Sequence, residues 1–267
     1  MLTTESFFDL TSNLHPQLFQ AGEYVWEPLN NLKEYLRQYP FEPLYTSVFK
    51  NNVPLDRTLI FHNGDILAGD EAILVFGDTT KGKLQVSLGG ELLAGASVLM
   101  AGSCFSGNEI AIGKGVLIES GAMIKAPVVI GDCNEIRQGA YLRGHIVSGR
   151  GCVLGHTTEI KHSIFLDDAK AGHFNYIGDS ILGNNTNLGA GTKFANLRFI
   201  DGNIHIDSDG TLIDTGRKKF GAILGDNCQT GCNSVTNPGT ILARECFVMP
   251  NATARSGFHP QGSVIRS

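Results

Sequence analysis

The sequence predicts an all-β solenoid, a parallel β-helix built from six-residue repeats. Aliphatic residues recur at every sixth position from Ile112 to Ile160, with Ser148 as the exception. Glycine accounts for 33 of the 267 residues, about 12% against a usual share of roughly 7%. No α-helix and no alternating strand has a period of six. A β-helix does, because each side of a coil turns one aliphatic residue inward and glycine fits the corners.

The repeat can be followed through most of the second half of the chain. The frame runs backwards through Ser106, Met100, Ala94 and Leu88, shortens by one residue at Phe165 and at Leu182, continues through Leu188, and resumes at Leu224, Thr230, Thr236, Leu242 and Val248. The fifth position of each hexad is usually small or β-branched, and it holds Cys104, Cys152, Cys228 and Cys246. We interpret these cysteines as small core residues. No CxxC pair occurs, so neither a zinc ribbon nor a thioredoxin-like motif is predicted.

The elements outside the repeat are predicted in chain order. Residues 23–37 place Val25, Trp26, Leu29, Leu32 and Leu36 on one stripe of a helix, with a proline tolerated in its first turn. Residues 58–62 and 72–76 read as strands bounded by Asn-Gly and Gly-Asp turns. We therefore expect a small helical cap region over residues 1–87 and the solenoid over residues 88–267.

The hexads stop between residues 196 and 220. Apolar and polar residues alternate there on both sides of an Asp-Gly turn at Asp209–Gly210, which predicts a two-stranded hairpin inserted at about 197–220. Insertions in solenoids commonly line the binding face.

Composition excludes several classes of partner. The formal net charge is −5, and a nucleic-acid binder needs an excess of lysine and arginine. No run of about 18 apolar residues is present, so we expect no membrane span. The start MLTTESFFDL lacks a basic segment before an apolar stretch, so a secretory signal is not expected. We expect a cytoplasmic protein with reduced thiols.

Because the hexads stack coil upon coil, the spacing of residues in the sequence predicts which side chains are neighbours. Arg143 and Lys161 are both second residues of their hexads and lie one full coil apart, so they stack about 4.8 Å from each other. Two stacked cations repel unless an anion lies between them; the alternative is that both point into solvent or meet Asp or Glu of a neighbour. His156, His173 and Ala190 share the third position. Two stacked imidazoles could bind a metal only with a third ligand of the right placement, and no metal site is predicted.

The strings RGHIVSGRGCVLGHTTEIK and AGHFNYIGDSILGNNTNLGAGT carry a family resemblance. They resemble the hexapeptide-repeat, left-handed β-helix acyltransferases. Within these, they look like the acetyltransferase half of bifunctional glucosamine-1-phosphate acetyltransferase / N-acetylglucosamine-1-phosphate uridyltransferase. The resemblance runs without a gap from Arg143 to Asn196. The later string DTGRKKFGAILGDNCQTGCN is similar to related sugar-phosphate nucleotidyltransferases with the same β-helix.

The resemblance implies roles for individual residues. His173 falls on the family's catalytic base. Residues that match the substrate-binding positions are Arg143 and Lys161, which would hold the sugar phosphate, with Tyr176, Asn187, Asn196 and Lys219. Ala190 and Cys232, the latter in place of a serine, match positions on the acetyl-CoA side. The implied protein is a homotrimer that uses acetyl-CoA as co-substrate and needs no metal for acetyl transfer.

The expected activity is acetyl-CoA-dependent N-acetylation of an amino-sugar phosphate or of a nucleotide-linked amino sugar. No G-x-G-T-R signature is present, so nucleotidyl transfer is not expected. The family's Tyr-Asp-Gly after Asn196 is replaced by Leu197-Arg198 and the insertion. Three alternatives stay open: another acyl donor such as acyl-carrier protein, another acceptor, or a non-catalytic β-helix that acts as a scaffold or binds a sugar phosphate.

Overall fold

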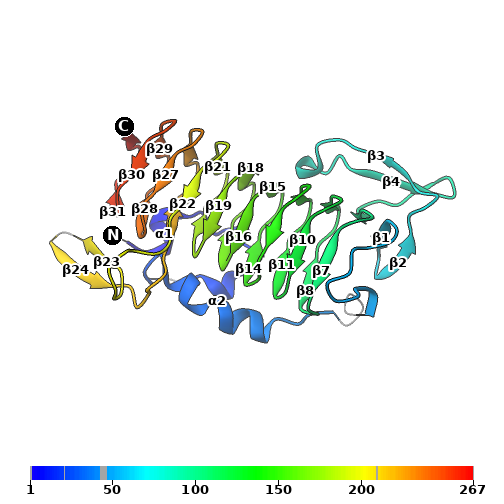
Figure 1. The fold of residues 1–267 in the computed structure, drawn as a ribbon, viewed down its shortest axis with the longest axis horizontal. Helices are drawn as coiled ribbons and strands as arrows, with labels where there is room; N and C mark the ends of the chain where they lie inside the picture. The colour runs from blue at the N-terminus through cyan, green and yellow to red at the C-terminus, as the bar shows by residue number, and fades with distance from the viewer. Residues whose placement is uncertain (1, 21, 43–46, 209, 267) are drawn as a thin grey trace.

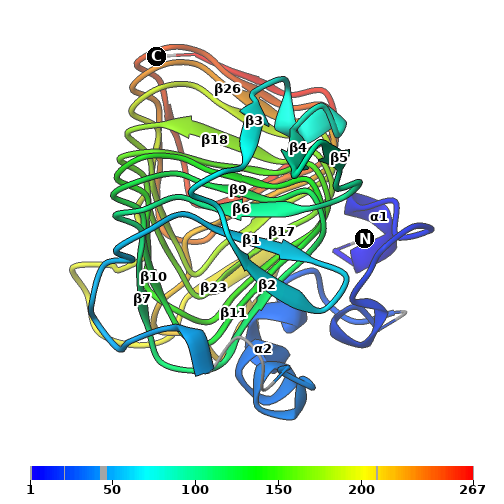
Figure 2. The same cartoon turned by 90° about the vertical axis from the view of Figure 1, so that its right-hand side faces the viewer.

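A computed structural model of the protein describes residues 2–20, 22–42, 47–208 and 210–266 (Figure 1). Its strands stack coil upon coil into a prism with three β-sheet faces (Figures 1 and 2). The parallel β-helix predicted from the six-residue period is confirmed. No helix in the described ranges is both long and apolar enough to span a membrane.

Each face is named here by one of its strands, and all pairs within the stack are parallel. The β9 face contains β6 (Ser97–Leu99), β9 (Leu117–Ile118), β12 (Glu135–Ile136), β15 (Val153–His156), β18 (Lys170–His173), β21 (Asn187–Leu188), β26 (Gln229–Thr230), β29 (Phe247–Val248) and β32 (Val264–Ile265). The β10 face contains β7 (Cys104–Ser106), β10 (Met123–Lys125), β13 (Tyr141–Leu142), β16 (Glu159–Lys161), β19 (Tyr176–Gly178), β22 (Lys193–Phe194), β27 (Val235–Thr236) and β30 (Thr253–Ala254). The β11 face contains β8 (Ile110–Ile112), β11 (Val128–Ile130), β14 (Ile146–Ser148), β17 (Ser163–Phe165), β20 (Ile181–Leu182), β25 (Ala222–Leu224), β28 (Thr240–Leu242) and β31 (Gly257–His259).

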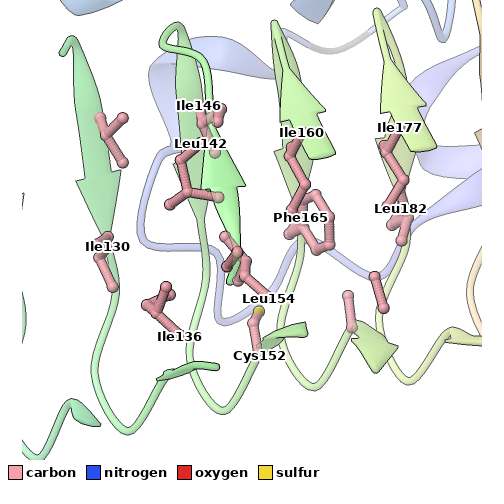
Figure 3. Close-up of a cluster of buried hydrophobic side chains, with 14 of the residues drawn as sticks. Ile130, Ile136, Leu142, Ile146, Cys152, Leu154, Ile160, Phe165, Ile177 and Leu182 are labelled. Carbon is pink, nitrogen blue, oxygen red and sulfur yellow. The ribbon is translucent and has the colours of Figure 1, made fainter. Parts of the chain in front are cut away.

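The leading residues of the hexads form the interior of the prism, as predicted from Ile112 onwards. Figure 3 shows Ile130, Ile136, Leu142, Leu154, Ile160 and Phe165 pointing into it, each at most 2% exposed. The exception in the pattern, Ser148, is also fully buried. Its hydroxyl accepts a hydrogen bond from Asn134 Nδ2 at 2.6 Å, which compensates for placing a polar group in the core.

The predicted frame is wrong before Ile112. Leu99 and Phe105 are buried there and belong to the same apolar cluster as the inward column that starts at Ile112. The positions predicted to face inward, Leu88, Ala94, Met100 and Ser106, are all partly or fully exposed. Phe105 and Ile112 are seven residues apart instead of six, so every position upstream shifts by one.

The shift also changes the environment of one cysteine. Cys152, Cys228 and Cys246 are buried as predicted, whereas Cys104 lies outside the core and is half-buried. Every one of the six cysteines is a free thiol.

The N-terminal segment lies along the β11 face of the stack. It contains α1 (Thr4–Phe7), the 3₁₀ turn η1 (Pro16–Leu18) and α2 (Glu27–Gln38), with Pro28 in the first turn of α2 (Figure 2). The helix predicted over 23–37 is confirmed with a later start. Leu29, Leu32 and Leu36 join one apolar cluster with Val147 and Ile181, whose side chains point outward from the β11 face. Burial of these aliphatic side chains explains why the helix packs there.

The predicted strands close the first coil and form a separate small sheet. Residues 58–62 contain β1 (Leu59–His62), which pairs antiparallel with β2 (Asp65–Ala68) and with β6. Residues 72–76 contain β3 (Ile73–Val75), which forms an antiparallel sheet with β4 (Gln85–Leu88) and β5 (Glu91–Leu92), with the 3₁₀ turn η2 (Thr79–Lys81) between β3 and β4. The domain boundary at residue 88 stays a prediction.

The inserted hairpin is formed by β23 (His205–Ser208) and β24 (Thr211–Asp214), which pair antiparallel. Of the predicted Asp-Gly turn, Asp209 lies outside the described residues. Ile204 and Ile206 are buried in the same apolar cluster as α2. The insertion therefore packs onto the solenoid, and its return segment reaches the corner between the β10 and β11 faces.

Candidate functional site

A basic cleft of about 560 Å³ lies at the corner between the β10 and β11 faces. Three parts of the chain form its walls: the first half of α2, the corner residues of three successive coils, and residues 216–219 after the inserted hairpin. Six lining residues are lysine or arginine, namely Lys33, Arg143, Lys161, Arg217, Lys218 and Lys219. The lining includes a single carboxylate, that of Asp179. Such a surplus of cations favours an anionic ligand.

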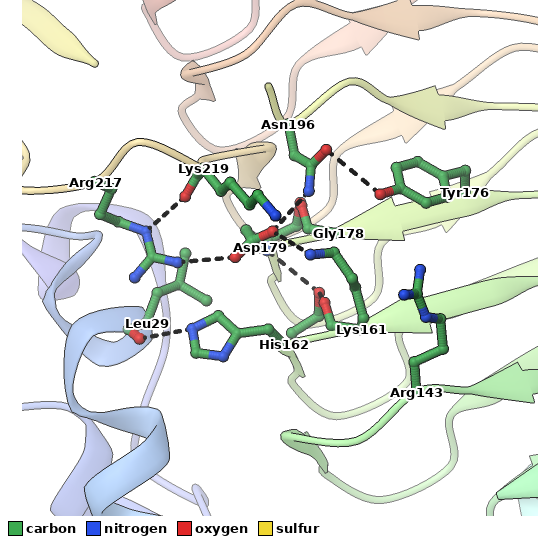
Figure 4. Close-up of polar contacts among 12 residues, drawn as sticks. Leu29, Arg143, Lys161, His162, Tyr176, Gly178, Asp179, Asn196, Arg217 and Lys219 are labelled. Carbon is green, nitrogen blue, oxygen red and sulfur yellow. Dashed lines mark hydrogen bonds and ion pairs between the residues drawn. The ribbon is translucent and has the colours of Figure 1, made fainter. Parts of the chain in front are cut away.

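Asp179 is the centre of a buried network at the floor of this cleft (Figure 4). It is 5% exposed, and three donors reach its carboxylate. These are Lys161 Nζ at 3.2 Å, Arg217 Nη2 at 3.1 Å and Asn196 Nδ2 at 2.6 Å. A buried carboxylate is tolerated because its charge is paired and its lone pairs are hydrogen-bonded.

The network continues along the β10 face to Tyr176. The Tyr176 hydroxyl donates to Asn196 Oδ1 at 3.4 Å, while the amide nitrogen of Asn196 donates to Asp179. Partial burial raises the pKa of Tyr176, with Glu159 adding to the effect, so the phenol stays protonated and able to donate. Tyr176, Asn196 and Lys161, three of the residues predicted to bind substrate, are thus brought together.

Arg143 and Lys161 stack as predicted, since Leu142 and Ile160 just before them are paired in the parallel ladder. Each of the two cations already has a carboxylate partner. Arg143 Nη1 lies 2.6 Å from Glu159 Oε1, and Lys161 pairs with Asp179. The structure therefore shows the alternative in which neighbouring carboxylates offset the repulsion, and no anion between the cations is required.

Arg217 and His162 attach α2 to this corner. Arg217 Nη1 donates to Asn30 Oδ1 at 2.9 Å, and Arg217 Nε donates to the carbonyl of Lys219 at 3.1 Å. His162 Nε2 donates to the carbonyl of Leu29 at 3.0 Å. Burial and, to a smaller extent, the nearby Arg217 lower the pKa of His162 to about 4. The imidazole is therefore neutral at pH 7 with its proton on Nε2.

The sequence prediction missed Asp179, Arg217, His162 and Lys33. A signal existed for the corner residues, because His145, His162 and Asp179 are spaced by 17 residues once the two shortened hexads are taken into account. All three have positive φ, between 45° and 54°, and form one column along the corner. No pattern in the sequence predicts that Arg217 or Lys33 would join this column.

His173 lies at the opposite edge of the β10 face. It pairs in register with His156, as predicted. It is exposed, and within the described part of the chain no group is hydrogen-bonded to its imidazole. Ala190 is stacked above it, since Gly191 N donates to the His173 carbonyl at 3.0 Å. Cys232 follows in the next coil, where Asn233 N donates to the Ala190 carbonyl at 2.8 Å.

The predicted site residues therefore form two groups. His173, Ala190 and Cys232 occupy one edge of the β10 face, and the basic cleft occupies the other. Gly178, which pairs with Lys161, is five residues after His173, a separation of at most roughly 16 Å along an extended strand. Tyr176 lies between the two edges. Asn187 is apart from both groups, in β21 on the β9 face, where it pairs with Lys170.

Lys219 lines the basic cleft and forms an isolated bridge with Leu197. Its predicted contact with the substrate stays a prediction. Among the described residues, no three His, Cys, Asp or Glu side chains are grouped as metal ligands.

Comparison with known proteins agrees with this architecture. The profile of the family described as the GMPPB C-terminal domain matches residues 124–261, just over half of the chain. The chain belongs to this family. The match begins within β10 and ends before β32. It covers the His173 column and two walls of the basic cleft, the solenoid corner and residues 216–219, but not the wall formed by α2.

Curated relatives confirm the predicted resemblance. A bifunctional sugar-1-phosphate nucleotidylyltransferase/acetyltransferase of Sulfurisphaera tokodaii is 34% identical over 147 residues, which cover 48% of this chain and 37% of the relative. The bifunctional protein GlmU of Methanococcus vannielii is 38% identical over 132 residues, 47% of this chain and 32% of the relative. The chain thus spans about a third of the length of these relatives. A Francisella novicida UDP-N-acetylglucosamine acyltransferase shares 16% identity over 57% of this chain and 54% of its own, with a TM-score of 0.39, too low to support an argument.

Proposed function

We propose that the protein is an acetyl-CoA-dependent N-acetyltransferase whose acceptor is an amino sugar carrying phosphate. The observation that carries this proposal is the polar network of Tyr176, Asn196, Asp179 and Lys161, which joins a basic cleft to the face that His173 borders. A phosphate in the cleft would anchor the acceptor, and the network would orient its hydroxyls. The sugar amine would then lie toward His173.

In this proposal His173 acts as general base, a common role of imidazole near neutral pH. It takes a proton from the amine as nitrogen attacks the thioester carbonyl. The new carbon–nitrogen bond forms, the carbon–sulfur bond breaks, and the thiol of coenzyme A leaves with a proton.

The oxyanion that forms during the attack needs a hydrogen-bond donor, and the backbone hydrogen bonds around Ala190 indicate which N–H group is free to serve. The N–H groups of Gly189 and Gly191 already donate to Thr230 and His173. The N–H of Ala190 has no acceptor among the described residues, and we assign it to stabilise the developing charge.

The proposed assembly is a homotrimer with sites between neighbouring copies. His173, Ala190 and Cys232 lie along an edge of the prism, so a second chain could complete the acetyl-CoA site there. The N-terminal segment already covers the β11 face through the cluster that contains Leu29 and Ile181. The β9 and β10 faces are the ones left for association.

One specific observation favours a second candidate function, binding of a sugar phosphate without acetyl transfer. A general base is usually oriented by a second group, and no such partner of the His173 imidazole is present in the described ranges. An imidazole without an orienting partner suits a binding or scaffold subunit as well as an enzyme.

Replacement of His173 by alanine separates the two functions. Thiol release from acetyl-CoA is measured with glucosamine 1-phosphate and with UDP-glucosamine. Loss of a general base typically slows turnover by about 10² to 10⁴, whereas His156→Ala, one coil away in the same column, should keep most of the activity. Both side chains lie outside the core, so both variants should keep the wild-type unfolding midpoint. Wild-type protein that binds a sugar phosphate without releasing thiol would favour the second candidate.

A further inference from the structure

The basic cleft contains more positive charge than its own carboxylate neutralises. Arg143, Lys161 and Arg217 have ion-pair partners. Lys33, Lys218 and Lys219 do not: no carboxylate of the described residues lies within 4.0 Å of their ammonium groups. The cleft therefore has a surplus of three cations that the fold itself does not use.

Two histidines in the cleft are partly buried beside these cations. The pKa of His145 is lowered, first by burial and then by Lys33, while Glu109 opposes the change. The His145 ring is 5.9 Å from that of His162, whose pKa is lowered by burial and by Arg217. Cations from α2 and from the loop after the hairpin thus act on the corner column from two sides.

The three surplus lysines come from two of the three walls. Lys219 lies on the side of the cleft where the loop bridges to Leu197, beside the network of Asp179 and Asn196. Lys33 lies on α2, and Lys218 lies on the loop after the hairpin. A single phosphate held at Arg143, Lys161 and Lys219 would leave Lys33 and Lys218 without an anion. A cleft of about 560 Å³ is within the usual range for a whole small ligand.

We propose that Lys33 and Lys218 bind a second phosphate group, so that the acceptor is a nucleoside-diphosphate-linked amino sugar and not a sugar monophosphate. This inference rests on the proposed function in one respect: the sugar is oriented from the cleft toward His173. The phosphate next to the sugar lies at Arg143, Lys161 and Lys219, and the second phosphate lies against α2.

Coenzyme A also contains a diphosphate, so a diphosphate could come from the acceptor or from the donor. The predicted positions of the two ligands on the β10 face distinguish them. The His173, Ala190 and Cys232 column, which is predicted to contact acetyl-CoA, lies at the opposite edge of the β10 face. A diphosphate in the basic cleft therefore belongs to the acceptor, and coenzyme A should bind independently of Lys33 and Lys218.

The test is calorimetric titration of the full chain, without acyl donor, by three probes: UDP-glucosamine, glucosamine 1-phosphate and coenzyme A. We expect Lys33→Ala and Lys218→Ala each to weaken UDP-glucosamine binding about three- to tenfold, as for one solvent-accessible charged contact. Binding of glucosamine 1-phosphate and of coenzyme A should change less than about twofold. Lys33→Arg should restore most of the affinity. The matched control is Lys114→Ala, an exposed lysine outside the cleft.

The outcomes distinguish this inference from the proposed function. Lysine-dependent binding of UDP-glucosamine supports the second phosphate site even if no thiol is ever released from acetyl-CoA. Equal weakening of glucosamine 1-phosphate and UDP-glucosamine in the lysine variants would overturn the inference while leaving acetyl transfer untouched. A lysine dependence confined to coenzyme A would also overturn it, because the diphosphate would then belong to the donor.

Discussion

Replacement of Asp179 by alanine tests whether the corner network holds the N-terminal helix on the solenoid. The substitution removes the anion that pairs with both Arg217 and Lys161. The Arg217 side chain is only 10% exposed and that of Lys161 is 20% exposed. Neither cation can recover full hydration without moving, so the variant carries two uncompensated buried charges.

The expected loss follows from that burial. Removing one partner of a buried ion pair typically costs about 3–5 kcal/mol, because the remaining charge is desolvated without compensation. Arg217 should account for most of the loss, since Lys161 retains more access to water. Asp179→Asn, which still accepts hydrogen bonds but carries no charge, should show a smaller loss. Arg217 also bonds Asn30, so the weakening should be concentrated where α2 contacts the corner.

The chain offers a local probe for this measurement. Its single tryptophan, Trp26, is 1% exposed and immediately precedes α2. Urea unfolding followed by Trp26 fluorescence reports undocking of the N-terminal segment, while circular dichroism reports the β-helix. We expect Asp179→Ala to lower the fluorescence midpoint more than the dichroism midpoint, since solenoids lose structure in parts.

The control is Glu34→Ala, which removes the carboxylate partner of Arg37 on the same helix. Those side chains are 53% and 74% exposed, and exposed pairs contribute little to stability, so neither midpoint should move. A loss of less than about 1 kcal/mol in Asp179→Ala, or a loss equal to that of Glu34→Ala, would refute the argument that the buried network anchors α2.

Two further predictions concern stability. Burial lowers the pKa of His15 and of His162 to about 4, whereas the pKa of histidine in the unfolded chain is about 6.5. Between these values the unfolded state binds more protons than the folded state, so the free energy of unfolding should fall as the pH decreases from about 6.5 to 4. Equal stability in urea titrations at pH 7 and pH 5 would contradict this prediction. Gly155→Ala should destabilise the protein by about 1–3 kcal/mol or more, because the new Cβ would collide with the carbonyl oxygen of Gly172 in the next coil. The matched control is Gly172→Ala, whose new Cβ would have only Arg137 Nη1 nearby, at 3.7 Å. Similar urea midpoints for the two variants would count against the close stacking of the coils.

The part of the site that depends only on stacking could be predicted from the sequence. Coil arithmetic placed Lys161 next to Arg143 and His173 next to His156, because in a solenoid each residue contacts neighbours one repeat away. The same arithmetic failed before Ile112, where one extra residue shifted the frame. It also did not reveal the carboxylate partners of Arg143 and Lys161, since the period gives the position of a residue and not the direction of its side chain.

The amino-acid sequence by itself determined the period of six, the inward aliphatic column from Ile112 onwards and the order of residues along each face. Those features follow from local geometry, because each hexad repeats the same strand and corner. Only the tertiary structure decided that α2 covers the β11 face and that Arg217 meets Asp179. Both contacts join non-repeating segments to the solenoid. Such contacts depend on which outward surface is apolar and on which buried charge lacks a partner. Both properties exist only in the folded chain, so the sequence pattern does not give them.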